Sequence, residues 1–248
     1  MVSTKPDDGI VRIAGAGLSG AVIARELAEA GLRVEVFEPR SHVGGNCHTE
    51  RDPATGILLH QHGPHIFHTD DMEVWDYVRR FATFYTFRHR VLATHAGRVF
   101  QLPIHLGTLC QFYDTALTPQ SARDRVARDI AASQPPRDAP DTFETAALRL
   151  IGRPLYEAFF KGYTEKQWGV SADRLPGSIL RRLPLRWHFD DSYFAHPVQA
   201  MPEDGYTPMV AAMLDHAGID LHLGRAMTPE DAMQDGVAHT FRTAPMRA

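Results

Sequence analysis

The chain has 248 residues, of which 44% are hydrophobic and 23% charged, and a formal net charge of −4. This length allows one large domain or two smaller ones, and the composition is that of a soluble globular protein. A slightly acidic chain gives no electrostatic reason to bind nucleic acid or an anionic membrane, so we expect neither as a partner.

Cysteine content and hydropathy predict a cytoplasmic location. The two cysteines, Cys47 and Cys110, are too few for a disulfide framework or a four-cysteine zinc site. Met1 to Gly9 lack the apolar segment of a signal peptide. No stretch approaches the ~20 apolar residues that a membrane-spanning helix needs. We therefore expect a protein that is neither secreted nor inserted in a membrane.

The N-terminal region has the pattern of a strand–helix–strand unit. Residues 9–14 are an apolar run typical of a buried strand, and residues 18–30 have helical spacing with one apolar side. Gly31 ends that helix, and residues 33–37 form a second apolar strand. A unit of this size requires a right-handed crossover, so the two strands are predicted to be parallel.

A glycine fingerprint joins the first strand to the helix: Gly15-x-Gly17-x-x-Gly20. In this context the three glycines allow a tight turn, close approach of a pyrophosphate and close packing of helix on strand. The helix N-terminus adds free N–H groups and a partial positive charge. We predict a dinucleotide site here.

Two features after the second strand select the cofactor. Glu38, at the end of that strand, is placed to accept hydrogen bonds from an adenosine ribose and would repel a 2′-phosphate. Gly44-Gly45-Asn46 then form a second glycine turn, typical of FAD-binding folds of the glutathione reductase type. Arg40 either meets the pyrophosphate or is a solvated surface charge. FAD is the predicted cofactor.

The rest of the chain alternates between helical and extended patterns. Residues 41–69 are predicted to form loops and short strands, followed by a helix in 72–84 with Val74, Trp75, Val78 and Phe81 inward and a hairpin in 91–102 around Gly97. A helix runs from Thr118-Pro119 to about 132 with Thr118 as N-cap, a Pro-rich linker follows in 134–141, and helices in 142–160 are interrupted at Gly152-Arg153-Pro154. The last predicted elements are strand character in 182–193, a helix in 206–216 and a strand in 219–223, with little core-forming potential after 224.

These patterns predict an α/β fold. We expect a Rossmann-type FAD-binding domain like that of glutathione reductase, with an inserted mainly helical domain and a mixed sheet. The predicted regions are 1–70 for the FAD-binding unit and flavin loop, 71–180 for a mainly helical substrate side, and 181–248 for a strand-rich return segment.

Four histidines, His60, His62, His65 and His68, lie within one short segment and raise the question of a metal site. On an extended segment His60 and His62 share a face, but the later pair needs a turn at Gly63-Pro64. No cysteine accompanies them, so we predict no metal here. Cys47 is interpreted as a small filler rather than a nucleophile.

Several longer segments together resemble the UDP-galactopyranose mutase family. In order along the chain these are GAGLSGAVIARELA, HVGGNCHTE, HGPHIFHTDD, IGRPLYEAFFKGYTEKQWG, RRLPLRWHFDDSYF and DGYTPM. They keep the family's order and spacing from about residue 10 to 223, and KGYTEKQWG is the most specific of them. The resemblance implies an isomerase, with FAD as cofactor, that interconverts UDP-galactopyranose and UDP-galactofuranose for cell-wall polysaccharide synthesis. It also implies that reduced FAD attacks the sugar through N5 and that the resulting adduct lets the ring reclose.

The resemblance also assigns roles to individual residues. Those implied for FAD are Gly15, Gly17, Leu18, Gly20, Glu38, Arg40, Gly45 and Asn46. Those implied for the UDP-sugar are Phe159 and Tyr163 at the uracil, Gln111 at its edge, Trp168 beside sugar and flavin, Arg182 and Tyr193 at the diphosphate, and His89 on the substrate side. His65 or His68 would tune the flavin or carry a proton, and Trp168 completes the implied catalytic set.

Alternatives exist for several of these residues and for the chain as a whole. Phe159 has the pattern of a core residue, Arg182 that of a solvated charge, and Arg186 competes for the phosphate role. The family's C-terminal portion, with further strands and diphosphate ligands, has no counterpart in this sequence. The resemblance therefore predicts a flavin site that is open, or one completed by a homodimer or a complementing chain. A non-catalytic FAD/UDP-sugar-binding protein and an amine oxidase-type flavin oxidoreductase remain as alternatives.

Overall fold

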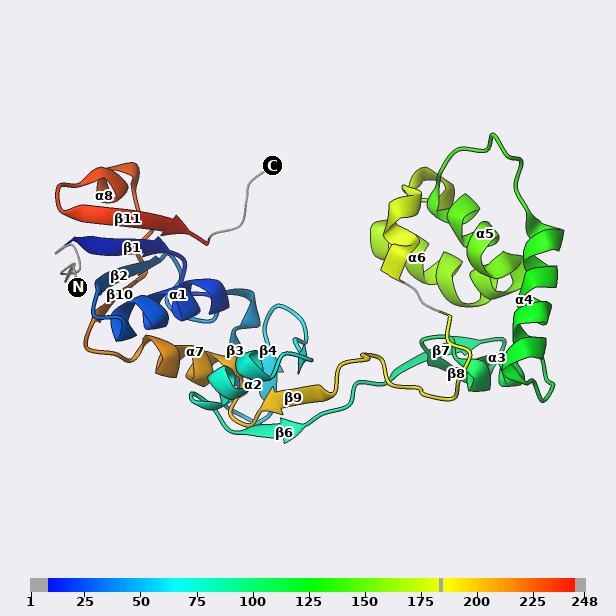
Figure 1. The fold of residues 1–248 in the computed structure, drawn as a ribbon, viewed down its shortest axis with the longest axis horizontal. Helices are drawn as coiled ribbons and strands as arrows, with labels where there is room; N and C mark the ends of the chain where they lie inside the picture. The colour runs from blue at the N-terminus through cyan, green and yellow to red at the C-terminus, as the bar shows by residue number, and fades with distance from the viewer. Residues whose placement is uncertain (1–8, 183–184, 244–248) are drawn as a thin grey trace, which may run out of the picture. The chain divides into compact units, whose positions relative to one another are not determined.

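The computed structural model describes residues 9–182 and 185–243, and the chain divides into two compact units. Unit 1 comprises Met1–Phe87 and His196–Ala248, and unit 2 comprises Arg88–Ala195 (Figure 1). Unit 2 is thus an insertion into unit 1, as the sequence predicted, but its limits differ from the predicted 71 and 180. They shift because residues 84–86 pair with residues 200–202 in one antiparallel sheet, which keeps both segments in unit 1.

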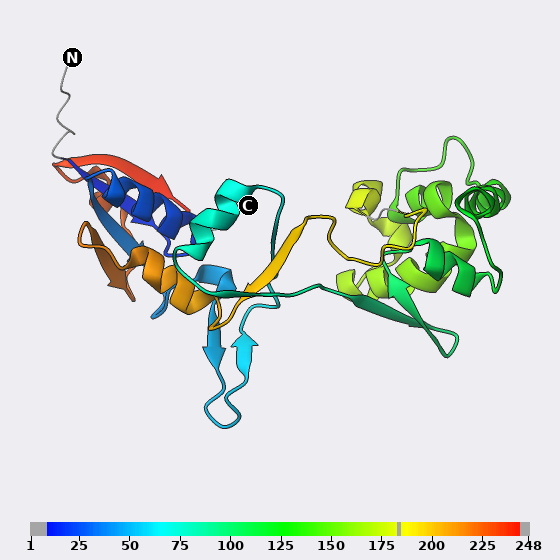
Figure 2. The same ribbon diagram turned by 60° about the horizontal axis from the view of Figure 1, so that its bottom comes forward.

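A four-stranded parallel sheet forms the centre of unit 1. Its order is β10-β2-β1-β11, where the strands are β1 (Ile10–Ala14), β2 (Arg33–Glu38), β10 (Ile219–Leu223) and β11 (Val237–Arg242). Helix α1 (Leu18–Glu29) connects β1 to β2, and α7 (Tyr206–Leu214) lies beside it (Figures 1 and 2). The predicted strand–helix–strand unit and its parallel pairing are confirmed.

The two faces of this sheet differ in chemistry because successive strand residues point to opposite sides. The face toward α1 and α7 is apolar, with Ile13, Val36 and Met213 fully buried in one core. The opposite face carries polar residues at the alternate positions of the same strands, including Arg12 and Glu35. A short helix, α8 (Pro229–Met233), connects β10 to β11 along the chain.

Short elements complete unit 1. They are a 3₁₀ turn (Gly45–Cys47), the hairpin β3 (Thr49–Arg51) and β4 (Leu58–His60), α2 (Met72–Arg79), and the antiparallel sheet of β5 (Phe67–Thr69), β9 (Val198–Pro202) and β6 (Phe84–Thr86). Helix α2 ends earlier than predicted, and Val74 is 44% exposed rather than inward. Trp75 does pack inward, against Phe67 and Phe84.

Unit 2 is mainly helical. Its elements are the hairpin β7 (Val91–His95) and β8 (Arg98–Leu102), α3 (Leu106–Phe112), α4 (Pro119–Ser133), α5 (Phe143–Tyr156), a π-helical turn (Glu157–Lys161), α6 (Gly162–Trp168), and two 3₁₀ turns (Ala172–Arg174 and Gly177–Arg182). Three predictions are confirmed: the hairpin, Thr118 as a capping residue and a break at Gly152, whose φ is 75°. Gly152 also lets α5 approach α4, since a Cβ there would lie 2.8 Å from the Asp129 carbonyl carbon.

Two predictions were wrong. Residues 185–193 form no strand, because side chains satisfy the backbone there: Arg186 donates to the Ser192 and Tyr193 carbonyl oxygens. Strands of opposite sense occupy separate sheets among the described residues, rather than one mixed sheet. The low core-forming potential predicted after residue 224 is confirmed, since neither α8 nor β11 contains a buried residue, although residues 237–242 do form a strand. Within the part of the chain that the structure describes, no helix is both long enough and apolar enough to cross a membrane.

Candidate functional site

The fingerprint loop between β1 and α1 requires glycine at its key positions. Gly15 has a φ of 108°, a backbone conformation that side chains strongly disfavour. A Cβ on Gly20 would lie 1.9 Å from the Gly15 carbonyl oxygen, which is a severe clash. The loop therefore passes over the first turn of α1 with no space for a side chain.

The second glycine turn folds onto this loop. Gly44, with a φ of 98°, donates its N–H to the Ala16 carbonyl oxygen at 2.9 Å. A Cβ on Gly45 would lie 3.2 Å from the Gly17 Cα, so the two glycine turns meet backbone to backbone. We call these two turns the glycine cradle; within it Gly17 and Gly45 are partly exposed.

Glu38 anchors both turns. It is only 5% exposed, and its two carboxylate oxygens accept hydrogen bonds from the backbone N–H groups of Ala16 and Arg40, each at 3.0 Å. The Arg40 guanidinium donates to the Asn46 side-chain oxygen at 3.3 Å. The eight residues predicted to bind FAD thus lie together around one loop cluster at the carboxyl ends of β1 and β2.

The N-terminus of α1 carries no competing acceptor. Its N-cap, Gly17, makes no side-chain cap, and the first turn contains no acidic residue. In contrast, Asp71, Thr118 and Thr142 cap the helices that follow them. Because the first N–H groups of a helix need acceptors, the start of α1 is suited to an anion such as a pyrophosphate.

One residue of this cluster was missed by the sequence analysis. Thr243, just after β11, donates its N–H and its hydroxyl to the Ala14 carbonyl oxygen, both at 2.9 Å, and so braces the fingerprint loop. Its only sequence signal is the alternation of 237–242, which is too weak to predict a strand.

The histidine-rich segment contributes partly buried imidazoles to unit 1. The rings of His68 and His196 stack at 4.8 Å, with their Nδ1 atoms 2.6 Å apart. Burial, and secondly the neighbouring His196, lower the pKa of His68. Among the residues that the structure describes, the Nδ1 atom of His65 has no hydrogen-bond partner, although it is buried. Burial raises the pKa of the Cys47 thiol, which disfavours the nucleophilic thiolate.

The aromatic residues predicted to meet the substrate lie in unit 2, and several are exposed. Tyr163 is 71% exposed and Trp168 is 55% exposed, both on α6 after the π-helical turn. Tyr193 is 42% exposed and packs against His89, with ring centroids 5.2 Å apart, and against Phe194, with ring centroids 5.0 Å apart. Exposed aromatic rings of this kind are suited to stacking on a planar base.

Two other predicted substrate residues, Phe159 and Gln111, have a structural role in unit 2. Phe159 is 6% exposed and packs against Phe100 and Phe112 in the core. The side-chain amide of Gln111 donates to the Val99 carbonyl oxygen at 2.8 Å, which holds it against the hairpin. Arg182 ends a 3₁₀ turn, and its side chain lies outside the described part of the chain.

Fold and loop geometry together define a dinucleotide-binding protein of the Rossmann type. Residues 13–81 match the family described as NAD(P)-binding Rossmann-like domain, and residues 158–246 match the family UDP-galactopyranose mutase. In structure, the chain superimposes on a crystal structure of reduced UDP-galactopyranose mutase with a TM-score of 0.64, at 18% identity, over 87% of this chain and 48% of that one. This likeness supports the fold.

Comparison of sequences shows which proteins this chain is similar to. The chain is 48% identical, over 96% of its length and 61% of the relative, to a probable UDP-galactopyranose mutase of Klebsiella pneumoniae. It is 44% identical, over 93% of its length and 62% of the relative, to dTDP-fucopyranose mutase of Escherichia coli. The chain is therefore homologous to the UDP-galactopyranose mutases and their sugar-nucleotide relatives, which are isomerases, and this kinship supports FAD as its cofactor. It spans somewhat less than two thirds of the length of these relatives.

Proposed function

We propose that this chain acts as a flavin-dependent mutase that interconverts UDP-galactopyranose and UDP-galactofuranose. The observation that carries the proposal is the convergence of two glycine turns and a buried glutamate in a chain that is 48% identical to a probable UDP-galactopyranose mutase. We also propose a cytoplasmic location, a role in cell-wall polysaccharide synthesis, and assembly as a homodimer or with a second chain.

The cradle of unit 1 fits FAD. The N–H groups at the start of α1 would bind the pyrophosphate, because no side chain of the described residues caps this helix. Glu38 accepts one backbone hydrogen bond on each oxygen, and each oxygen retains a lone pair for a ribose hydroxyl. Gly17 and Gly45 are both partly exposed and would let the cofactor approach their main chain. When bound and reduced, FAD would supply the N5 nucleophile that displaces UDP from the sugar.

His65 and His68 would serve the flavin side of the reaction. The lowered pKa of His68 favours a neutral imidazole at pH 7, which can accept or donate a proton without adding a positive charge. His65 has a buried Nδ1 atom that needs a partner, and a ligand's polar group would satisfy it.

Substrate binding would fall to the exposed residues of unit 2. We propose that Tyr163 stacks on the uracil, Trp168 borders the sugar, and Tyr193 and Arg182 bind the diphosphate, with His89 beside Tyr193.

Phe159 would act indirectly, by supporting from the core the helix that carries Tyr163. Gln111 would reach the uracil edge only after leaving the Val99 carbonyl.

The test begins with a flavin spectrum of the purified chain reconstituted with FAD. Dithionite-reduced protein is then incubated with UDP-galactofuranose, and UDP-galactopyranose is measured by chromatography. We expect turnover with reduced and none with oxidised FAD. No turnover in protein shown to hold both FAD and UDP would contradict mutase activity for this chain.

The identity with dTDP-fucopyranose mutase favours one second candidate, a mutase acting on a dTDP-linked sugar. The same assay with dTDP-fucofuranose decides between the two substrates through the ratio of the two values of kcat/KM.

A further inference from the structure

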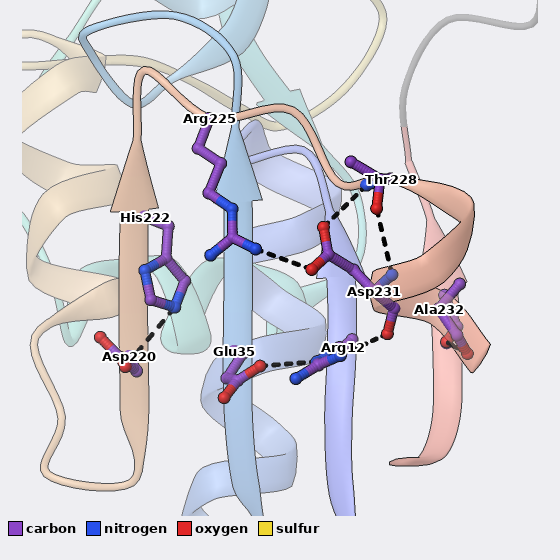
Figure 3. Close-up of polar contacts among 9 residues, drawn as sticks. Arg12, Glu35, Asp220, His222, Arg225, Thr228, Asp231 and Ala232 are labelled. Carbon is purple, nitrogen blue, oxygen red and sulfur yellow. Dashed lines mark hydrogen bonds and ion pairs between the residues drawn. The ribbon is translucent and has the colours of Figure 1, made fainter. Parts of the chain in front are cut away.

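The polar face of the parallel sheet in unit 1, opposite to α1, carries a compact group of potential metal ligands. They are Glu35 on β2 and Asp220 and His222 on β10, and one donor atom from each lies within 4.8 Å of the others (Figure 3). We propose that these three side chains bind a divalent first-row transition metal ion of the zinc class. This site lies on the face opposite to α1, apart from the glycine cradle at the ends of the strands.

Strand register brings the three side chains together. Asp220 pairs directly with Glu35 across the two parallel strands, and His222, two residues further along β10, projects from the same face. Two carboxylates in directly opposed positions repel each other unless a cation lies near. Arg12 provides one cation for Glu35, through a hydrogen bond of 2.6 Å. Among the described residues, the basic side chain paired with Asp220 is His222.

The spacing of donors fits a shared ion better than a direct hydrogen bond. His222 Nε2 and Asp220 Oδ2 are 3.5 Å apart, which exceeds the 2.7–3.2 Å usual for an N–H···O bond. Two ligands of one tetrahedral zinc ion, each bonded at about 2.0–2.1 Å, lie roughly 3.3–3.4 Å apart. The Asp220 side chain is 70% exposed, so its rotation can bring its carboxylate closer to that of Glu35.

Neighbouring side chains hold two of the ligands in place. The His222 ring stacks on Phe37, a fully buried residue, with centroids 4.8 Å apart and an angle of 24° between the planes. Arg12 binds Glu35 Oε2 and is itself held at its other end by the Asp231 carbonyl oxygen (Figure 3). Glu35 Oε1 accepts no hydrogen bond within the described residues, so it is available to a metal. Supports of this kind orient metal ligands in proteins.

The donor set indicates the class of ion. An imidazole with two carboxylates suits zinc, cobalt or manganese, whereas calcium and magnesium prefer oxygen ligands alone. Three protein ligands leave at least one position for water. The ion would connect β10, an outer strand, to β2 and so stabilise the sheet edge.

The test uses the full chain, stripped with a chelator and then titrated with Zn²⁺ by calorimetry and with Co²⁺ by visible absorption. We expect one site per chain, visible Co²⁺ bands, and affinity reduced roughly tenfold or more by Asp220→Asn or by His222→Gln. Zn²⁺ should also raise the Tm of the parent chain by a few degrees, and that of His222→Gln much less. Melting of each metal-free variant shows that it is folded.

Two controls make the test decisive. His239→Gln removes an exposed histidine of β11 in the same sheet and should leave Zn²⁺ affinity unchanged. His62→Gln removes an exposed histidine of the His-rich segment and should also have no effect. The proposal is overturned if Asp220→Asn and His222→Gln both retain full affinity, if affinity is lost with His62→Gln instead, or if Ca²⁺ binds more tightly than Zn²⁺.

Discussion

The two units carry different kinds of candidate binding residues. Unit 1 forms a cradle from main-chain atoms, with glycines in close contact and a buried glutamate beside them. Unit 2 has exposed aromatic side chains, Tyr163 and Trp168, on a short helix whose buried residue is Thr164. The residues proposed for the cofactor are therefore inseparable from the fold, whereas those proposed for the substrate can change with little cost in stability.

The largest expected effect comes from Gly20→Ala. Its Cβ would lie 1.9 Å from the Gly15 carbonyl oxygen, so the loop must move. We expect a loss of about 3 kcal/mol in the free energy of unfolding and no FAD in the purified protein. The measurements are chemical denaturation and the flavin absorbance.

Gly162→Ala is the matched control in unit 2. Gly162 is helical, with φ −63° and ψ −39°, and a Cβ there meets nothing within 4 Å. We expect stabilisation of about 0.5–1 kcal/mol and normal FAD content. If Gly20→Ala behaves like Gly162→Ala, the cradle is not constrained as described.

Phe159→Ala and Tyr163→Ala separate core from surface within unit 2. Phe159 is buried against Phe100 and Phe112, so its loss should destabilise the protein by ~3–5 kcal/mol. Tyr163 is largely exposed, so its loss should change stability by less than about 0.5 kcal/mol while weakening UDP binding. Denaturation and UDP calorimetry check this pair, and equal destabilisation by both would refute the distinction.

Glu38→Gln tests the anchor between the glycine turns. The amide must place an NH₂ group against a backbone N–H donor, either that of Ala16 or that of Arg40. We expect FAD affinity to fall by ~1–3 kcal/mol. Glu50→Gln, at a side chain that is 58% exposed, should leave FAD affinity unchanged. Fluorescence titration of FAD measures both, and unaltered affinity in Glu38→Gln would remove Glu38 from the site.

The smallest expected effect is a difference in acid sensitivity. Burial lowers the pKa of His48, His60 and His68 in unit 1 and of His105 in unit 2. As pH falls below about 6.5, the unfolded chain takes up protons before these folded imidazoles do, so stability is full above that pH and decreases below it. Between pH 7 and 5.5, unit 1 should lose more hydrogen-exchange protection than unit 2. Equal losses in the two units would contradict this expectation, and His68→Asn should reduce the slope in unit 1.

The sequence predicted the features that backbone conformation requires and missed those that depend on contacts between distant residues. The glycine turns and Glu38 were predictable because few other residues fit their positions. The pairing of His68 with His196 was not, because the two are 128 residues apart in sequence. The orientation of Tyr163 was hard to infer, since the π-helical turn before it shifts the phase of the helix. Strand β11 was missed because its alternation is weak and its stability comes from pairing with β1.

The route of the chain between the units has a consequence for engineering. Within unit 1, Phe87 N–H donates to the Gln199 carbonyl oxygen at 3.0 Å, so the outgoing and returning segments are already joined by the sheet. Within unit 2, Tyr193 N–H donates to the His89 carbonyl oxygen at 3.3 Å in the same manner. In each unit, the segment that leaves the unit and the segment that returns to it are therefore joined by a backbone hydrogen bond. A short linker in place of residues 88–195 should leave a foldable unit 1. Under the proposed function, exchanging residues 88–195 for the corresponding segment of a relative should change which sugar nucleotide binds.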